Sequence, residues 1–65
     1  MKITLEINNF DNDAMAENPQ LEVSRILRKM ADRVENEGVE NAFENRRLMD
    51  INGNQVGFCE VTDTN

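Results

Sequence analysis

The sequence predicts a small α+β domain, in which a three-stranded antiparallel sheet has one helix packed on one face. Three observations predict it. Apolar residues alternate at the start of the chain, an apolar stripe of helical period follows, and a turn sequence divides the last segment into two strands. The element order is β-α-β-β, and one helix over three strands is the economical way to bury their apolar residues. With 65 residues, the chain has room for one domain, residues 1–65.

Residues 1–8 alternate between apolar and polar side chains, which predicts a strand with one buried face. Ile3, Leu5 and Ile7 share one face, and Lys2, Thr4, Glu6 and Asn8 share the other. Residues 9–18 carry several carboxylates and no sustained periodicity, so we expect a loop there.

The segment from Pro19 to Glu37 has the signals of a helix at both ends. Asn18 is a preferred N-cap residue, and Pro19 is tolerated at the first helical position because its missing N–H has no partner there. Gly38 is a natural stop at the C-terminal end. The apolar residues between them form one stripe, which we expect to face the sheet: Val23, Ile26, Leu27, Met30, Ala31 and Val34.

Residues 38–45 fit two local structures. Val39, Ala42 and Phe43 can form one helical turn. The same residues can also fold back as a loop in which Phe43 closes the end of the core. The sequence leaves this choice open.

Residues 46–62 predict a hairpin, with strands over 47–51 and 55–62. Asp50 suits the first position of a type I turn because its carboxylate can accept backbone N–H groups, and Gly53 can adopt the positive φ that follows such a turn. Placing the last strand between the other two makes every pair antiparallel. A first strand parallel to the second, joined by a right-handed crossover, is the alternative.

Gly57 decides which way the last strand faces. Strict alternation places Val56 and Phe58 on one face, with Cys59 and Val61 on the other. A glycine within a strand often marks a bulge, which shifts the facing of its neighbours. We therefore expect Val56, Cys59 and Val61 to face the helix and Phe58 to face outward, while strict alternation would turn Phe58 inward.

The composition argues against an enzyme and against a bound cofactor or metal. The chain has no histidine and one cysteine, Cys59, so it can form no internal disulfide and cannot supply the nitrogen and sulfur ligands of a zinc site. Residues 50–54 resemble the start of a calcium loop. However, Gln55 stands where that loop needs glycine and Val61 where it needs glutamate, so a turn explains these residues better.

Thirteen acidic against seven basic residues give a net charge of −6, which repels nucleic acid and favours a partner with a basic surface. Four basic residues nevertheless lie on the exposed side of the helix: Arg25, Arg28, Lys29 and Arg33. We expect Glu22 to pair with Arg25, Arg28 with Asp32 and Arg33 with Glu37, at helical spacings of three or four residues. Direct nucleic-acid binding is therefore a secondary hypothesis. The chain has no membrane-spanning or signal-like apolar run, and we expect a cytoplasmic protein.

Two segments resemble a known group of proteins. Residues 23–34, VSRILRKMADRV, are similar to the "ARILRxLADRL" helix of small uncharacterised proteins encoded by phages and prophages, and residues 48–57, LMDINGNQVG, to their "LRDINGNxVG" hairpin. The two motifs cover about a third of the chain. The departures are Met30 in place of leucine and a long acidic connection over 35–45. The resemblance implies a phage origin and carries over no functional residue.

The leading functional hypothesis is a non-catalytic phage protein that blocks the surface of a host or defence protein, as anti-CRISPR proteins do. In that case it would act in the host cytoplasm. One alternative is a homodimeric structural or accessory phage protein, and another is a regulator that touches nucleic acid through the basic helix face. An outward aromatic beside a methionine is typical of an interface centre, with charged residues at its rim. The candidate partner-binding residues are Met49, Phe58, Glu35, Glu37, Glu40 and Glu44.

Overall fold

The computed structural model describes residues 1–11 and 13–63 and has the predicted α+β fold. Its elements are β1 (Lys2–Ile7), α1 (Asp13–Glu17), α2 (Pro19–Glu37), α3 (Val39–Phe43), β2 (Arg46–Met49) and β3 (Gln55–Thr62). The strands form one sheet in the order β1-β3-β2, and both pairs are antiparallel. This order confirms the prediction that the last strand is central.

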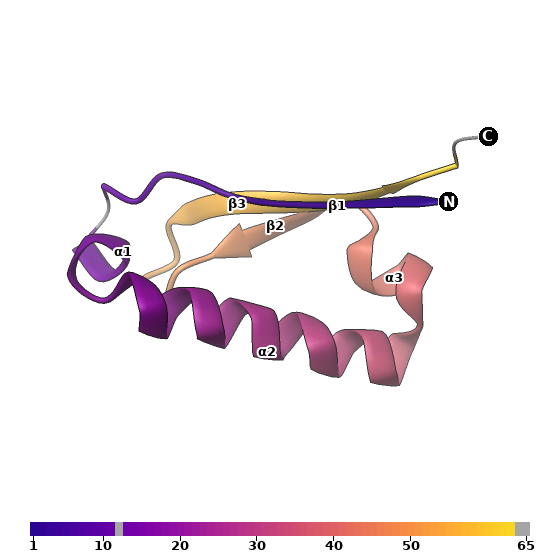
Figure 1. The fold of residues 1–65 in the computed structure, drawn as a ribbon, viewed down its shortest axis with the longest axis horizontal. Coiled ribbons are helices and arrows are strands. Elements are labelled where there is room, and N and C mark those ends of the chain that lie inside the picture. Colours follow the sequence, from indigo (N-terminus) through magenta and orange to yellow (C-terminus); the bar gives the residue numbers. More distant parts are fainter. Residues whose placement is uncertain (12, 64–65) are drawn as a thin grey trace.

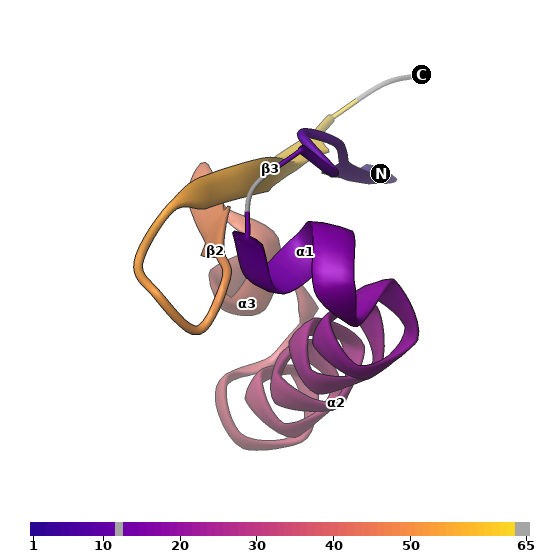
Figure 2. The same ribbon diagram turned by 90° about the vertical axis from the view of Figure 1, so that its left-hand side faces the viewer.

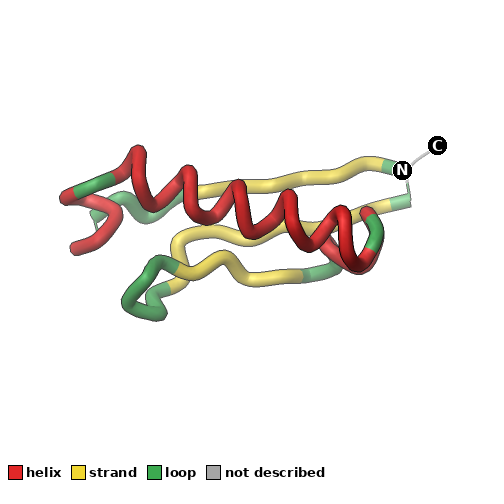
Figure 3. The backbone as a smooth tube through the Cα atoms, turned by 90° about the horizontal axis from the view of Figure 1, so that it is seen from below, coloured by secondary structure: helices red, strands yellow, loops and turns green. Residues whose placement is uncertain are grey.

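The described helices all lie against one face of the sheet, and no described segment covers the other face. Figure 1 shows the sheet edge-on, with α2 and α3 on one side of it. The end-on view adds α1, which lies between α2 and the strands (Figure 2). Seen from the helical side, α2 crosses the sheet at an angle (Figure 3). The fold therefore has two layers.

Helix α2 begins and ends at the predicted residues. The carbonyl of Asn18 accepts a hydrogen bond from the Glu22 N–H at 3.0 Å, but within the described residues the Asn18 side chain caps nothing. At the other end Gly38 has a φ of 89°, and its N–H donates to the Val34 carbonyl. The helix therefore stops where the chain needs the left-handed backbone that glycine adopts freely.

Two further helices correct the prediction of a single one. The expected loop over 9–18, of which residue 12 lies outside the described residues, contains α1, and its Met15 is completely buried. The undecided segment after Gly38 forms α3, which buries Ala42. Such short helices are held by packing more than by their own propensity, so local periodicity gave no signal for α1.

The buried face of α2 is rotated from the predicted stripe. Ile26 and Met30 are buried as expected, but Leu27 is 47% exposed and Ala31 is also exposed. Glu22 is buried instead, because its carboxylate accepts the Ile51 N–H at 2.9 Å. The hairpin turn thus lies against the start of α2, and the expectation that Leu27 and Ala31 face the core is wrong.

An irregularity beside Gly57 sets the facing of β3. Leu48 pairs with Gly57 and Met49 with Gln55, so Val56 is an extra residue opposite β2. Val56 and Gly57 are both buried, after which alternation resumes with Cys59 buried and Phe58 37% exposed. The predicted bulge and the outward position of Phe58 are confirmed. The preceding strand is shorter than expected, since β2 ends at Met49.

Ile26 and Leu27 provide a test of the rotated helix face. We expect Ile26→Ala to lower the free energy of unfolding by about 2–5 kcal/mol because it leaves a cavity in the core. Leu27→Ala should change it by less than about 1 kcal/mol, as is usual at an exposed position. Urea unfolding followed by circular dichroism measures both changes. Equal losses would show that Leu27 shares the buried face.

Gly57 provides a test of the close approach between β1 and β3. A Cβ at this position would overlap the Glu6 carbonyl oxygen and approach the Ile7 Cα at 3.0 Å. Both obstacles are backbone atoms of β1, so Gly57→Ala should destabilise the protein by roughly 1–3 kcal/mol, the usual cost of overpacking. Thr62→Ala, at an exposed position on the same strand, is the matched control. Unchanged stability of Gly57→Ala would contradict the close approach of β1 and β3.

Candidate protein-binding surfaces

The uncovered face of the sheet presents two apolar side chains. Phe58 on the central strand is 37% exposed, and Met49 on β2 is 40% exposed. Phe58 lies between Glu6 of β1 and Arg47 of β2 in the strand register, so charged residues of opposite sign stand on its two sides. Thr4 and Glu6, expected to face outward, are on this face too. We call these residues, Thr4, Glu6, Arg47, Met49 and Phe58, the open face.

The acidic candidates do not lie on the open face. Glu35 and Glu37 are at the end of α2, and Glu40 and Glu44 are in and directly after α3, on the helical side of the sheet (Figure 1). All four are exposed. Glu37 is engaged within the chain, because its carboxylate pairs with Arg33 at 3.7 Å and with Arg46 at 3.6 Å. The structure therefore divides the predicted contact residues between two surfaces.

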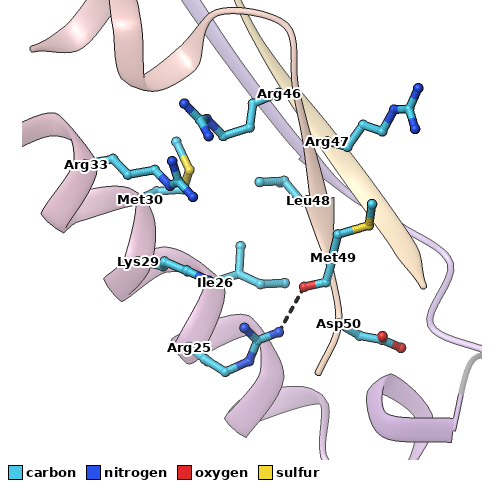
Figure 4. A pocket seen from close by; sticks show the side chains of 10 residues that line it. All are labelled: Arg25, Ile26, Lys29, Met30, Arg33, Arg46, Arg47, Leu48, Met49 and Asp50. Atoms are coloured by element: carbon cyan, nitrogen blue, oxygen red, sulfur yellow. Dashed lines mark hydrogen bonds between the residues drawn. The ribbon is translucent and has the colours of Figure 1, made fainter. Parts of the chain in front are cut away.

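A groove between α2 and β2 gathers most of the basic residues and encloses about 160 Å³. Arg25, Lys29 and Arg33 line it from the helix, and Arg46 faces them from β2 (Figure 4). Figure 4 shows that the Arg47 side chain points away from the helix. The helical spacing of the first three residues was visible in the sequence. The role of Arg46 was not, since it depends on how the hairpin packs.

Several of these basic side chains already bind carboxylate or carbonyl oxygens of the chain itself. Arg25 donates to the Met49 carbonyl at 2.9 Å (Figure 4) and pairs with Glu22 at 3.2 Å. Arg46 donates to the Ala42 carbonyl at 3.1 Å, in addition to its pairing with Glu37. The predicted pairs of Arg25 with Glu22 and Arg33 with Glu37 are confirmed. The predicted pair between residues 28 and 32 is not formed in the part of the chain that the structure describes.

The hairpin turn uses its oxygen atoms internally. One oxygen of Asp50 accepts the N–H groups of Asn52 and Asn54 at 2.9 and 2.8 Å, and the other accepts the Asn54 side-chain amide at 3.1 Å. Gly53, with a φ of 85°, donates its N–H to the Asp50 carbonyl. This is the predicted turn, and the hydrogen bonds that Asp50 accepts close the loop on itself.

The environment of Asp50 and that of Cys59 shift their pKa values in opposite directions. Burial alone would raise the pKa of the Asp50 carboxyl, but the hydrogen bonds from Asn54 and Asn52, with the charge of Arg25, hold that pKa below its ordinary value. Burial raises the pKa of the Cys59 thiol, although Arg46 and Arg33 oppose the rise. Cys59 is completely buried, so its thiol acts as a small apolar core group.

Comparison with protein-family models, with curated proteins and with solved structures finds no match to this chain. Among the described residues no helix is both long and apolar enough to cross a membrane. The same residues hold no cluster of three or more histidine, cysteine, aspartate or glutamate side chains placed to bind a metal ion. The fold defines the chain as a small two-layer α+β protein in which the described residues leave one side of the sheet uncovered.

We predict that the Asp50 carboxyl makes the folded protein less stable in acid. Its folded pKa lies below the ordinary value of 3.8, so the folded protein binds this proton less readily than the unfolded chain does. The resulting stabilisation is present above that value and is lost as the pH falls through the folded pKa. We expect Asp50→Asn to be less stable than the parent at neutral pH and to lose less stability on acidification.

Urea unfolding at neutral and acidic pH measures this difference. Glu17→Gln removes an exposed carboxylate from α1 and is the matched control, which should follow the acid dependence of the parent. An Asp50→Asn variant with the acid dependence of the parent would show that the turn carboxylate contributes nothing to it.

Proposed function

We propose that this protein is a non-catalytic binding protein that acts by covering a surface of another protein. The single observation that carries the proposal is the open face, where Phe58 and Met49 stand exposed on a sheet that the described helices cover only on its other side. Exposed aromatic and methionine side chains are enriched at the centres of protein interfaces. The resemblance of residues 23–34 and 48–57 to phage proteins supports an inhibitor of a host or defence protein, similar in its manner of action to anti-CRISPR proteins.

The charge of the chain supports a partner with a basic surface. The net charge is −6, and Glu35, Glu40 and Glu44 are exposed at the end of the molecule where α2 meets α3. These carboxylates lie away from Phe58, so they act by attracting the partner over a distance rather than by touching the same site. The expected partner has an apolar pocket for Phe58 and a surface that is basic beyond that pocket, as on a protein that binds nucleic acid.

The basic groove supports the alternative of a regulator that touches nucleic acid. Against it, Arg25, Arg33 and Arg46 each pair with a carboxylate of the chain itself. Within the part of the chain that the structure describes, no aromatic side chain lines the groove for base stacking. Binding to DNA that weakens steeply with salt would favour this alternative over the protein-binding proposal.

Phe58→Ser tests the proposed contact. The parent protein, immobilised, should capture a host protein, and Phe58→Ser should weaken that capture at least tenfold, as removal of a central aromatic anchor does. Leu21→Ser on α2 removes another exposed apolar side chain, 62% exposed, and is the matched control for surface hydrophobicity. Raised salt should slow association, because screening removes the attraction between an acidic protein and a basic partner.

Two further measurements complete this test. Expression of the parent in a host that carries the targeted defence system should restore phage plaques, and expression of Phe58→Ser should not. Circular dichroism melting shows whether the variant is still folded. A folded Phe58→Ser variant that captures and protects as well as the parent would contradict the open face as the contact surface.

A further inference from the structure

Strand β1 has a hydrogen-bonding side that no described strand covers. It lies at the edge of the sheet, next to β3 only. Continuing its register places Asn8 opposite Val56, and the Asn8 N–H donates to the Val56 carbonyl at 2.6 Å. Bonded and non-bonded pairs alternate along an antiparallel ladder. The bonded partners of β3 are therefore Lys2, Thr4 and Glu6, and the backbone groups of Ile3, Leu5 and Ile7 point away from the sheet.

We propose that two copies of this chain pair through β1, antiparallel and with Thr4 on the two-fold axis, to form a continuous six-stranded sheet. In this register Ile3 of one copy lies opposite Leu5 of the other, and both residues present their free backbone groups to each other. The register also places Lys2 opposite Glu6 of the second copy. The inference rests on the edge strand and is independent of the function proposed above.

The side chains of β1 are complementary to themselves in this register. On the outer face, each Lys2 meets a Glu6 and the two Thr4 side chains meet at the axis. On the helical face, Ile3 meets Leu5 and Met1 meets Ile7, so every pair is apolar. Opposite charges, paired threonines and apolar neighbours are the cross-strand pairs that stabilise antiparallel sheets. A two-fold interface requires such a self-complementary surface.

Exposed apolar side chains also lie on the side of the molecule where β1 forms the edge of the sheet. Ile3, on the helical face of β1, is 42% exposed, and Met1, which directly precedes β1, is 62% exposed. On α2, Leu27 is 47% exposed and lies on the flank opposite the groove, which opens toward β2. Leu27 therefore lies toward the β1 side. Pairing two β1 edges places both α2 helices on the same face of the sheet, with these flanks turned toward each other.

A second copy is a better occupant of this edge than an unrelated strand. In the antiparallel register, Lys2, Thr4 and Glu6 of one copy each have a complementary partner in the second copy. The pairing therefore requires no residues from another protein. A domain of 65 residues buries a small share of its surface, and association is one of the routes by which such domains gain stability. Exposed edge strands also favour pairing with another chain, because their backbone groups lack partners.

Charge reversal across the axis is the first test. Sedimentation equilibrium of the parent should show a monomer–dimer equilibrium. Lys2→Glu and Glu6→Lys should each weaken dimerisation roughly tenfold, because symmetry converts two attractive pairs into two repulsive ones. The double variant, Lys2→Glu with Glu6→Lys, should restore the parent dimer. Asp32→Lys makes the same charge change as Glu6→Lys on the exposed side of α2 and should leave dimerisation unchanged.

A cysteine at the axis is the second test. Residues paired without backbone hydrogen bonds lie about 4.5 Å apart between Cα atoms, which is within the range that a disulfide spans. Thr4→Cys should therefore form a disulfide-linked dimer under mild oxidation, and Leu5→Cys should not. The native Cys59 is completely buried and does not compete in the folded protein.

Three results would overturn the proposal. One is a parent protein that remains monomeric at the highest concentration it tolerates. A second is cross-linking through Leu5→Cys in preference to Thr4→Cys, which would place the axis elsewhere. The third is a dimer that Phe58→Ser abolishes and charge reversal at Lys2 does not affect, because that dimer would use the open face. Circular dichroism of each variant shows whether it is folded, and rescue by the double variant excludes a loss of fold as the cause.

Discussion

The close approach of β1 to Gly57 is the constraint on which the rest of the structure depends. A side chain at this position would overlap the backbone of Glu6, so β3 can approach β1 this closely only because residue 57 is a glycine. The bulge beside it turns Val56 and Gly57 to the same side of the sheet. From that point on, Cys59 faces the core and Phe58 faces away from it. In a strand without the bulge, Cys59 would face away from the core, and the aromatic ring of Phe58 would be buried under α2.

A second set of contacts joins the hairpin to the helix. The buried Glu22 carboxylate accepts hydrogen bonds from Ile51 and Arg25, and Arg25 also donates to the Met49 carbonyl. A buried carboxylate is tolerated when donors surround it, whereas an unpaired one is costly. These bonds fix the rotation of α2. They explain why a glutamate occupies the buried face and why Leu27 lies at its margin.

The distribution of charge follows from the same packing. Four of the seven basic residues line the groove between α2 and β2, namely Arg25, Lys29, Arg33 and Arg46. Exposed carboxylates are concentrated where α2 meets α3. Glu37 lies between these two regions and pairs with Arg33 and Arg46. The molecule is therefore strongly dipolar, with its open face, its groove and its acidic end in different places. Phe58 on the open face and Glu35, Glu40 and Glu44 at the acidic end do not line the groove, so mutations at these residues can separate binding by one surface from binding by another.

The sequence by itself determined those features that depend on neighbouring residues. Periodicity located β1 and the stripe that identifies α2, Gly38 marked the end of that helix, and Asp50 with Gly53 specified the turn. The glycine within β3 indicated the outward position of Phe58. Each of these signals acts over a few residues, because side-chain alternation and backbone dihedral angles are local properties.

Only the tertiary structure decided which candidate residues come together. Met15 is held in the core by packing between α1 and the rest of the chain, and no periodicity could indicate it. The burial of Glu22 depends on an N–H group 29 residues away. Met49 and Phe58 share the open face, while Glu35, Glu40 and Glu44 lie elsewhere, because strand pairing and helix packing set these positions. Such contacts join residues far apart in the chain, and their free energies depend on the whole fold rather than on any local pattern.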